Sequence, residues 1–147
     1  MTAPATRAAI IAAARGWLGT PYRHQASLRG AGCDCLGLLR GVWRELYGDE
    51  PEHVPPYALS WAESLGAETL ADAASRHLTP VAGAQMRPGD VLLFRWRAHR
   101  PAGHCAILSA PDRIIHAHDG AAVCEVALSP WWRRRLSHVF SFPQVTD

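Results

Sequence analysis

Residues 32–48 read Gly-Cys-Asp-Cys-Leu-Gly-Leu-Leu-Arg-Gly-Val-Trp-Arg-Glu-Leu-Tyr-Gly, and this stretch joins a reactive residue type to a helix start. Its apolar residues recur at helical spacing, Asp34 stands where an N-cap belongs, and Gly48 stands where a glycine would end the helix. Cys35 then falls in the first turn, where free N–H groups and the positive end of the helix dipole stabilise a thiolate. The pattern predicts a nucleophile at Cys35. The alternative is a small buried cysteine, and position alone does not decide between the two.

Two glycines, Gly37 and Gly41, lie four residues apart in this stretch. On a helix they form one bare stripe, because residues four apart share a face. The spacing predicts that this face lies close against a sheet.

Length and charge limit the possible classes of protein. A chain of 147 residues is expected to form a single domain over 1–147, and a net charge of +2 is too mild to indicate a nucleic-acid partner. The sequence shows no signal-peptide pattern and no run of about 18 apolar residues, so we expect a soluble protein made in the cytoplasm without a membrane partner. The four cysteines are expected to be reduced thiols: Cys33, Cys35, Cys105 and Cys124.

The first half of the chain reads as helices and loops. Thr6 is a candidate cap for a helix that ends at 19–21 and buries Ile10, Ile11, Ala14, Trp17 and Leu18 on one face. Residues 22–32 are predicted to be a surface loop that lines a site. Apolar spacing over 57–77 predicts one or two short helices broken at Gly66.

The second half changes to strand patterns. After a turn at 86–90, five strands are predicted: 91–94, 104–108, 113–117, 123–126 and 136–142. The second and third form a hairpin, and a further turn is predicted at 119–120. If the hairpin turns near Ala110, residues whose numbers sum to about 220 lie opposite one another, which places His104 across from His116. Helices followed by an antiparallel sheet predict an α+β domain.

A cysteine at a helix start and two histidines on neighbouring strands supply what a thiol hydrolase needs: a nucleophile, a base and a group that orients the base. The alternative for His104 is an ordinary edge-strand histidine. The remaining histidines that this pattern does not use are interpreted as structural or surface residues: His24, His77, His99, His118 and His138. Residues 131–135, Trp-Trp-Arg-Arg-Arg, are interpreted as a packed turn with a solvated face.

Five motifs follow one another along the chain: Thr20-Pro21-Tyr22, residues 33–38, 87–94, 103–107 and 114–117. Together they resemble the NlpC family of cell-wall cysteine peptidases, from about Ile10 to Phe142. The run 34–48 looks most like the phage branch of that family, which includes tail peptidases of phages and gene transfer agents.

The resemblance implies a papain-like α+β fold with N-terminal helices packed on a C-terminal antiparallel sheet. It implies that Cys35 attacks a peptide carbonyl, that His104 is the general base and that His116 orients His104. Tyr22 would place its hydroxyl toward the oxyanion or substrate, and Asp34 would face a substrate amine. The implied substrate is the bond between D-glutamate and a diamino acid in peptidoglycan stem peptides.

The phage branch further implies a tail component that acts in the periplasm or cell wall as part of a phage-like particle, with a tail hub or tip protein as partner. No cofactor is expected. Leu36 replaces the serine that often follows the catalytic cysteine, which weakens the expectation of a required free stem N-terminus. Cys33 and Cys105 either pack or oxidise with Cys35, and packing is favoured.

Three alternatives stay open. Zinc could be held by a subset of six residues, although the spacing lacks C-x₂-C: Cys33, Cys35, His104, Cys105, His116 and His118. A non-catalytic tail-tip or wall-binding module could share the fold. Amidases and acyltransferases related to this fold also use Cys and His.

Overall fold

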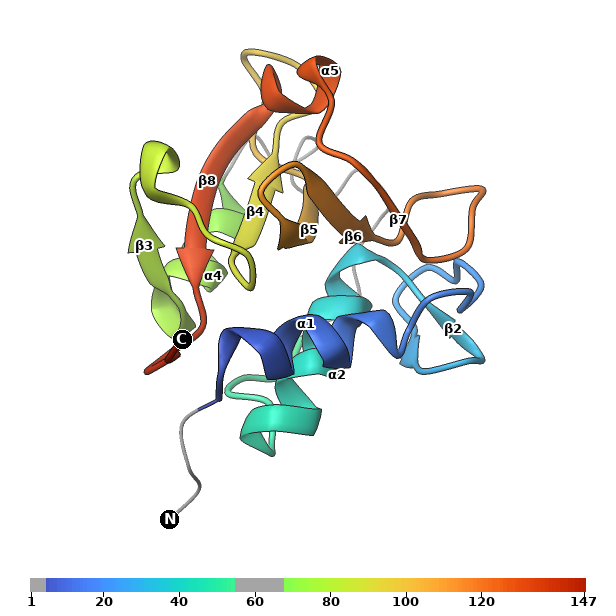
Figure 1. Cartoon of the computed structure of the whole chain (residues 1–147). Coiled ribbons are helices and arrows are strands. Elements are labelled where there is room, and N and C mark those ends of the chain that lie inside the picture. The colour runs from blue at the N-terminus through green and yellow to red at the C-terminus, as the bar shows by residue number, and fades with distance from the viewer. Residues whose placement is uncertain (1–4, 55–67) are drawn as a thin grey trace.

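The computed structural model describes residues 5–54 and 68–147, which form helices packed on an antiparallel sheet (Figure 1). The helices in this part of the chain are α1 (Arg7–Arg15), α2 (Cys35–Tyr47), α4 (Thr69–His77) and α5 (Pro130–Arg133), with a 3-10 turn η1 (Gly83–Gln85). The large sheet has the order β3-β8-β4-β5-β6-β7. Its strands are β3 (Thr79–Val81), β4 (Val91–Phe94), β5 (His104–Ala110), β6 (Arg113–His116), β7 (Cys124–Ala127) and β8 (Leu136–Ser141). The predicted α+β class is confirmed.

Helices α1 and α2 lie together on one side of the sheet, and α2 packs against β5 (Figure 1). The larger apolar core fills this interface, and a smaller one lies on the opposite face of the sheet. Strand β4 contributes to both, because Val91 and Leu93 enter the larger core while Leu92 and Phe94 enter the smaller one. Burial on both faces explains why the sequence of β4 is a continuous apolar run.

Helix α1 begins as predicted, since the Thr6 side chain accepts a hydrogen bond from the Ala9 N–H at 3.0 Å. The helix ends at Arg15, and a turn follows it. Trp17 is buried as expected, but Leu18 is 43% exposed. The prediction for Leu18 is wrong because the helical period no longer applies beyond Arg15.

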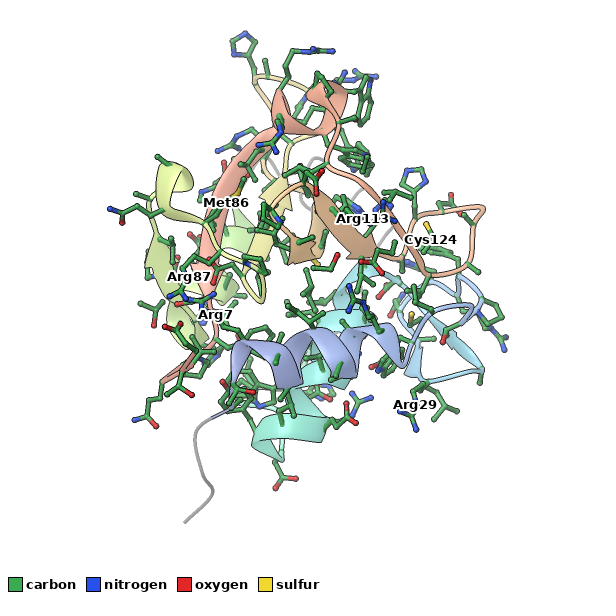
Figure 2. The ribbon with its side chains drawn as sticks, in the orientation of Figure 1. Arg7, Arg29, Met86, Arg87, Arg113 and Cys124 are labelled. Atoms are coloured by element: carbon green, nitrogen blue, oxygen red, sulfur yellow. The ribbon has the colours of Figure 1, made fainter. Side chains whose placement is uncertain are left out.

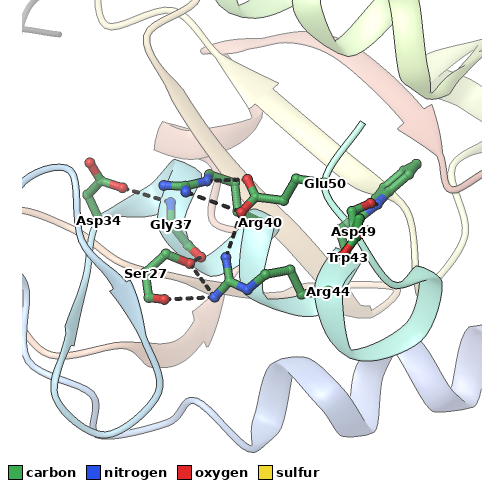
Figure 3. A network of polar contacts seen from close by, with 8 residues as sticks. All are labelled: Ser27, Asp34, Gly37, Arg40, Trp43, Arg44, Asp49 and Glu50. Atoms are coloured by element: carbon green, nitrogen blue, oxygen red, sulfur yellow. Dashed lines mark hydrogen bonds and ion pairs between the residues drawn. The ribbon is translucent and has the colours of Figure 1, made fainter. Parts of the chain in front are cut away.

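Helix α2 also has the predicted ends. Asp34 caps it by accepting from the Gly37 N–H at 2.7 Å, and Gly48 follows it with φ +86°. Polar contacts then fix its exposed side, where Arg40 and Arg44 both pair with Glu50 and Arg44 also donates to Ser27 (Figure 3). Ser27 belongs to a small hairpin of β1 (Ser27–Leu28) and β2 (Gly32–Cys33). The chain immediately before and after Cys35 is therefore held at several points.

The glycine stripe of α2 does not face the sheet. A Cβ on Gly37 would lie 1.9 Å from the Ala26 carbonyl oxygen, and one on Gly41 would lie 1.9 Å from the Trp17 ring. The prediction of contact with the sheet is wrong, because Ala26, just before β1, and Trp17, two residues after the end of α1, occupy that side. Both glycines still serve close packing, as the spacing indicated.

Gly37→Ala is expected to lower the free energy of unfolding by about 3 kcal/mol, because the new methyl group would meet backbone that cannot rotate away. Urea unfolding followed by circular dichroism measures the change. Gly83→Ala is the matched control, since a Cβ at Gly83 meets nothing within 4 Å and its φ is not positive. Equal stability of the Gly37 and Gly83 variants would contradict the close contact.

The β5–β6 hairpin has a register two residues away from the predicted one. Ile107 pairs with Ile115 and Leu108 with Ile114, and a bulge precedes the pair of Ala110 with Arg113. The turn lies at Pro111 and Asp112 and not at Ala110, and the bulge beside it changes the register by one residue. Since a shift of two residues preserves the face, the two predicted site histidines of this hairpin still lie on one face.

Several elements lie outside the sequence predictions. The expected loop at 22–32 contains β1 and β2, and neither β3 nor α5 was expected. Of the helices predicted over 57–77, α4 covers 69–77, and the stretch 57–67 with the break at Gly66 lies outside the described residues. In the described parts of the chain, no helix has the length and apolar character needed to cross a membrane.

Candidate active site

A pocket of about 220 Å³ opens where the start of α2 meets the ends of β5 and β6. Four of the five predicted site residues line it, and His116 lies directly behind His104. The lining residues are Tyr22, His24, Asp34, Cys35, Leu36, Trp96, Gly103, His104, Ala117, His118 and Asp119. The fold therefore brings together residues that are up to about 100 positions apart in the sequence.

Cys35 is the first residue of α2 and is partly exposed in this pocket. Hydrogen bonding by the Cys105 thiol is the largest cause that holds the pKa of Cys35 well below its usual range. Burial acts in the opposite direction, and the hydrogen bond and positive charge of His104 lower the pKa further. The arrangement favours a thiolate at Cys35.

Cys105, on strand β5, is the hydrogen-bonding neighbour of the Cys35 thiolate. Its sulfur lies 3.2 Å from the carbonyl oxygen of Cys35, and its own pKa is raised well above the usual range by hydrogen bonding to Cys35 and by burial. Cys105 therefore stays protonated. Its single S–H can turn to the carbonyl or to the Cys35 sulfur, and a thiolate is the stronger acceptor because it is charged.

The two site histidines form a buried pair. Nε2 of His104 lies 2.9 Å from Nδ1 of His116, and the residues are 3% and 4% exposed. With Nε2 of His104 committed to His116, Nδ1 is the ring nitrogen left for Cys35. Burial first, and then the positive charges of His104 and His118, lower the pKa of His116 to about 3. Through its Nδ1, a neutral His116 can accept a hydrogen bond from the Nε2–H of His104 and so orient that ring.

His116 should make the fold sensitive to acid. The folded protein keeps His116 neutral down to about pH 3, whereas the unfolded chain protonates it below about pH 6.5. Proton uptake then favours the unfolded state, so stability falls as the pH falls through this window. Between pH 7 and pH 4 the wild type should lose about 3 kcal/mol more than His116→Gln, measured by urea unfolding. Equal losses in the two proteins would contradict the neutral buried state.

Tyr22 reaches the pocket because its backbone pairs with Cys33 of β2. Burial, with the negative charges of Asp34 and Cys35, raises the pKa of the Tyr22 hydroxyl well above its usual range. The phenol therefore stays protonated and can donate a hydrogen bond. This agrees with its expected place beside the nucleophile.

Asp34 has a structural role that its sequence position indicated. It is 3% exposed, one oxygen accepts from the Gly37 N–H and the other from the Gln25 N–H, both at 2.7 Å, and His24 Nδ1 lies 3.9 Å away. Both oxygens are thus used to start α2 and to hold the preceding loop. Pairing of this carboxylate with a substrate amine stays a prediction.

Three residues near the histidine pair were not expected. His118, interpreted from the sequence as a structural or surface residue, lines the pocket from the segment after β6, where strand alternation does not apply. Trp132 stacks on His104 with ring centroids 5.4 Å apart, and Trp96 lies 5.0 Å from the same ring. No sequence signal linked these tryptophans to the site. Residues 131–135 have the packed and the solvated side that the sequence indicated, since Trp132 is packed and Trp131 is exposed, but 131–133 belong to helix α5 and not to a turn.

Other sequence expectations can be placed as well. Cys33 is fully buried, and burial raises its pKa to about 12, so packing is its role in this structure. His24, interpreted from the sequence as a structural or surface residue, lines the pocket. Across the ranges 5–54 and 68–147, no three His, Cys, Asp or Glu side chains gather as a set that could hold a metal ion.

The fold and the pocket define a class: α+β proteins in which a cysteine at a helix N-terminus faces a histidine pair on an antiparallel sheet. Residues 19–141 match the model of the NlpC/P60 family, and the chain belongs to that family. A comparison with curated proteins finds no match.

Solved structures of NlpC/P60 proteins have the same fold. The NlpC/p60 domain of the peptidoglycan hydrolase SagA is 25% identical, with 93% of this chain and 99% of that one covered and a TM-score of 0.64. An NlpC/P60 family protein from Bacillus cereus is 17% identical, with 95% and 41% covered and a TM-score of 0.69. The peptidoglycan hydrolase RipB from Mycobacterium tuberculosis is 14% identical, with 91% and 63% covered and a TM-score of 0.60. The chain thus spans the whole SagA domain but less than half of the Bacillus cereus protein.

Proposed function

We propose that the protein is a peptidoglycan endopeptidase that uses Cys35 as its nucleophile. The observation that carries this proposal is the hydrogen bond between His104 and Cys35, whose pKa is low. His116 in turn holds His104, with 2.9 Å between Nδ1 of His116 and Nε2 of His104. Membership of the NlpC/P60 family and the likeness to peptidoglycan hydrolases support the choice of substrate.

In the proposed reaction, the Cys35 thiolate attacks the carbonyl carbon of the scissile amide and forms a tetrahedral oxyanion. In this proposal the backbone N–H of Cys35, at the start of α2, and the protonated Tyr22 hydroxyl donate to that oxyanion. Protonated His104 gives its proton to the leaving amine, and a thioester forms on Cys35. His104 then takes a proton from water, whose hydroxide attacks the thioester and releases the acid and the free thiolate.

The proposed scissile bond joins the side-chain carboxyl of D-glutamate to the amine of a diamino acid. The motif resemblance supports this bond, and the pocket offers Asp34, His24 and His118 as polar groups around the nucleophile. Leu36 lines the same pocket without a hydroxyl, so we expect cleavage of stems whose first amine is blocked by the sugar as well as of free stems.

The experiment is mass spectrometry of purified stem peptides after incubation with the wild type, Cys35→Ala and Cys124→Ala. We expect fragments split between D-glutamate and the diamino acid with the wild type and Cys124→Ala, and none with Cys35→Ala. Cleavage at the sugar–peptide amide, or acyl transfer without hydrolysis, would replace the endopeptidase with an amidase or acyltransferase. No turnover by folded, reduced protein would favour a structural or wall-binding role.

We also propose that the protein works as a tail component of a phage-like particle and meets the cell wall in the periplasm through a tail hub or tip protein. The likeness of the run 34–48 to the phage branch supports this setting. Affinity purification of particles from the producing cells, followed by immunodetection of this chain, would test it. Absence of the chain from purified particles would contradict the proposal.

A further inference from the structure

The charges of this chain are strongly segregated. Residues 95–104 and 129–135 contain six of the fifteen basic residues and no acidic residue. The rest of the chain has nine basic and thirteen acidic residues and is therefore net negative. The mild net charge of +2 conceals a strongly cationic region.

The two cationic segments meet in the fold. The Arg95 N–H donates to the Arg135 carbonyl oxygen at 2.8 Å, and Trp96 lies 6.5 Å from Trp131 between ring centroids. Figure 1 shows the loop between β4 and β5 beside α5, at one end of the sheet. We call the surface that they form the arginine patch; it consists of Arg97, Arg100, Trp131, Arg133, Arg134 and Arg135.

The charges of the arginine patch are not neutralised within the described chain. Arg133 donates to the carbonyl oxygens of Leu128 and Pro111, and Arg135 donates to that of Trp131, so these contacts orient the guanidinium groups but leave their charge. No carboxylate in residues 5–54 and 68–147 forms an ion pair with a patch arginine. A cluster of like charges without counter-charges attracts a polyanion.

An aromatic path connects the patch to the candidate active site. Trp96 lines the pocket and contacts Trp131, whose side chain is 42% exposed. The Arg135 guanidinium lies 3.5 Å from the centre of the Trp131 ring. A ligand that occupies the pocket and extends beyond it along this path reaches the patch.

We infer that the arginine patch binds the carboxylate-rich peptidoglycan around the scissile stem peptide, with Trp131 against a sugar ring. The choice of partner rests on the proposed function. Stem peptides carry several carboxylates, which guanidinium groups bind in pairs of hydrogen bonds, and an exposed indole gives a sugar ring a flat apolar surface. Among the described residues, Trp131 is the one large exposed apolar side chain in the patch, so the surface lacks the apolar face that membrane insertion requires.

The test measures binding of the protein to purified peptidoglycan sacculi by co-sedimentation, with Cys35→Ala as the background so that no turnover occurs. Arg97→Glu/Arg134→Glu is compared with Arg29→Glu/Arg87→Glu, which changes the net charge equally. Figure 2 labels Arg29 and Arg87 far from α5, and all four arginines are exposed. At low salt we expect the Kd of the patch variant to rise about tenfold, and that of the control to stay within about twofold. The difference should shrink at about 1 M salt, because exposed charges are screened.

Three results would overturn the inference: unchanged binding by the patch variant, equal weakening in both double variants, or tighter binding to phosphatidylglycerol vesicles or duplex DNA than to sacculi. Circular dichroism of each variant shows that the fold is intact. Failure of the proposed reaction is a separate result, since it would appear as absent stem-peptide cleavage while patch-dependent sedimentation persists.

Discussion

Cys35→Ser is expected to lower kcat/KM on a stem-peptide substrate by at least about 10⁴-fold, because a serine hydroxyl is hardly ionised under conditions in which Cys35 is a thiolate. The contacts of Cys105 and His104 that lower the pKa of a thiol cannot bring a hydroxyl into the same range. Steady-state cleavage, followed by chromatographic separation of the fragments, measures the loss.

Cys124→Ser is the control for thiol replacement. Cys124 starts β7, and burial raises its pKa, so it does not supply a reactive thiolate. Its variant should keep activity within about twofold of the wild type. More than about 1% of wild-type activity in Cys35→Ser would contradict the need for a thiolate at position 35.

His104→Ala is expected to lower kcat by about 10³-fold or more and to make Cys35 less reactive toward iodoacetamide at pH 6. The variant loses both the general base and the hydrogen bond and positive charge that lower the pKa of Cys35. That pKa then rises, and a smaller fraction of Cys35 is thiolate at pH 6. The alkylation rate should recover as the pH is raised toward 9 while the buried Cys33 stays unlabelled, which a damaged fold would not show.

His53→Ala is the matched control, because His53 is exposed and does not line the pocket. It should alkylate at the wild-type rate. A wild-type alkylation rate in His104→Ala would contradict the contribution of His104 and leave the Cys105 thiol as the cause of the low pKa. Cys105→Ala, measured in the same way, separates the two contributions.

Local signals made the helix that carries Cys35 predictable. Asp34 and Gly48 mark its two ends, and the structure has both the side-chain cap and the positive φ that these residues imply. The buried strand β4 was equally clear, because an apolar run of strand length followed a turn. These predictions succeeded because neighbouring residues alone determine caps, turns and strand periods.

The pairing of His104 with His116 survived an error in the register. The turn of the β5–β6 hairpin lies later than Ala110, so that with the bulge the pairing differs from the predicted one by two residues. An even shift keeps side chains on their face. The histidines consequently meet at 2.9 Å although they are not directly opposite as predicted. A one-residue error would have separated them.

The surroundings of the site could not be predicted in the same way. Trp132 reaches His104 from α5, a four-residue helix between β7 and β8, and Trp96 reaches it from the loop after β4. Their positions depend on how distant segments pack against each other. The spacing of residues along one segment carries no information about that packing. The role of Cys105 beside Cys35 also depends on the contact between β5 and α2.

Because of that contact, the reactivity of Cys35 reports whether α2 has docked on β5. The thiolate belongs to the helical first half and the groups that lower its pKa belong to the sheet, so neither half alone has a strongly activated thiol. During refolding, pulses of a thiol label at pH 6 should modify Cys35 quickly only after α2 has docked on β5. The time course of labelling would then separate the docking of the two halves from the earlier formation of helices, a long-range step that loop closure makes slow.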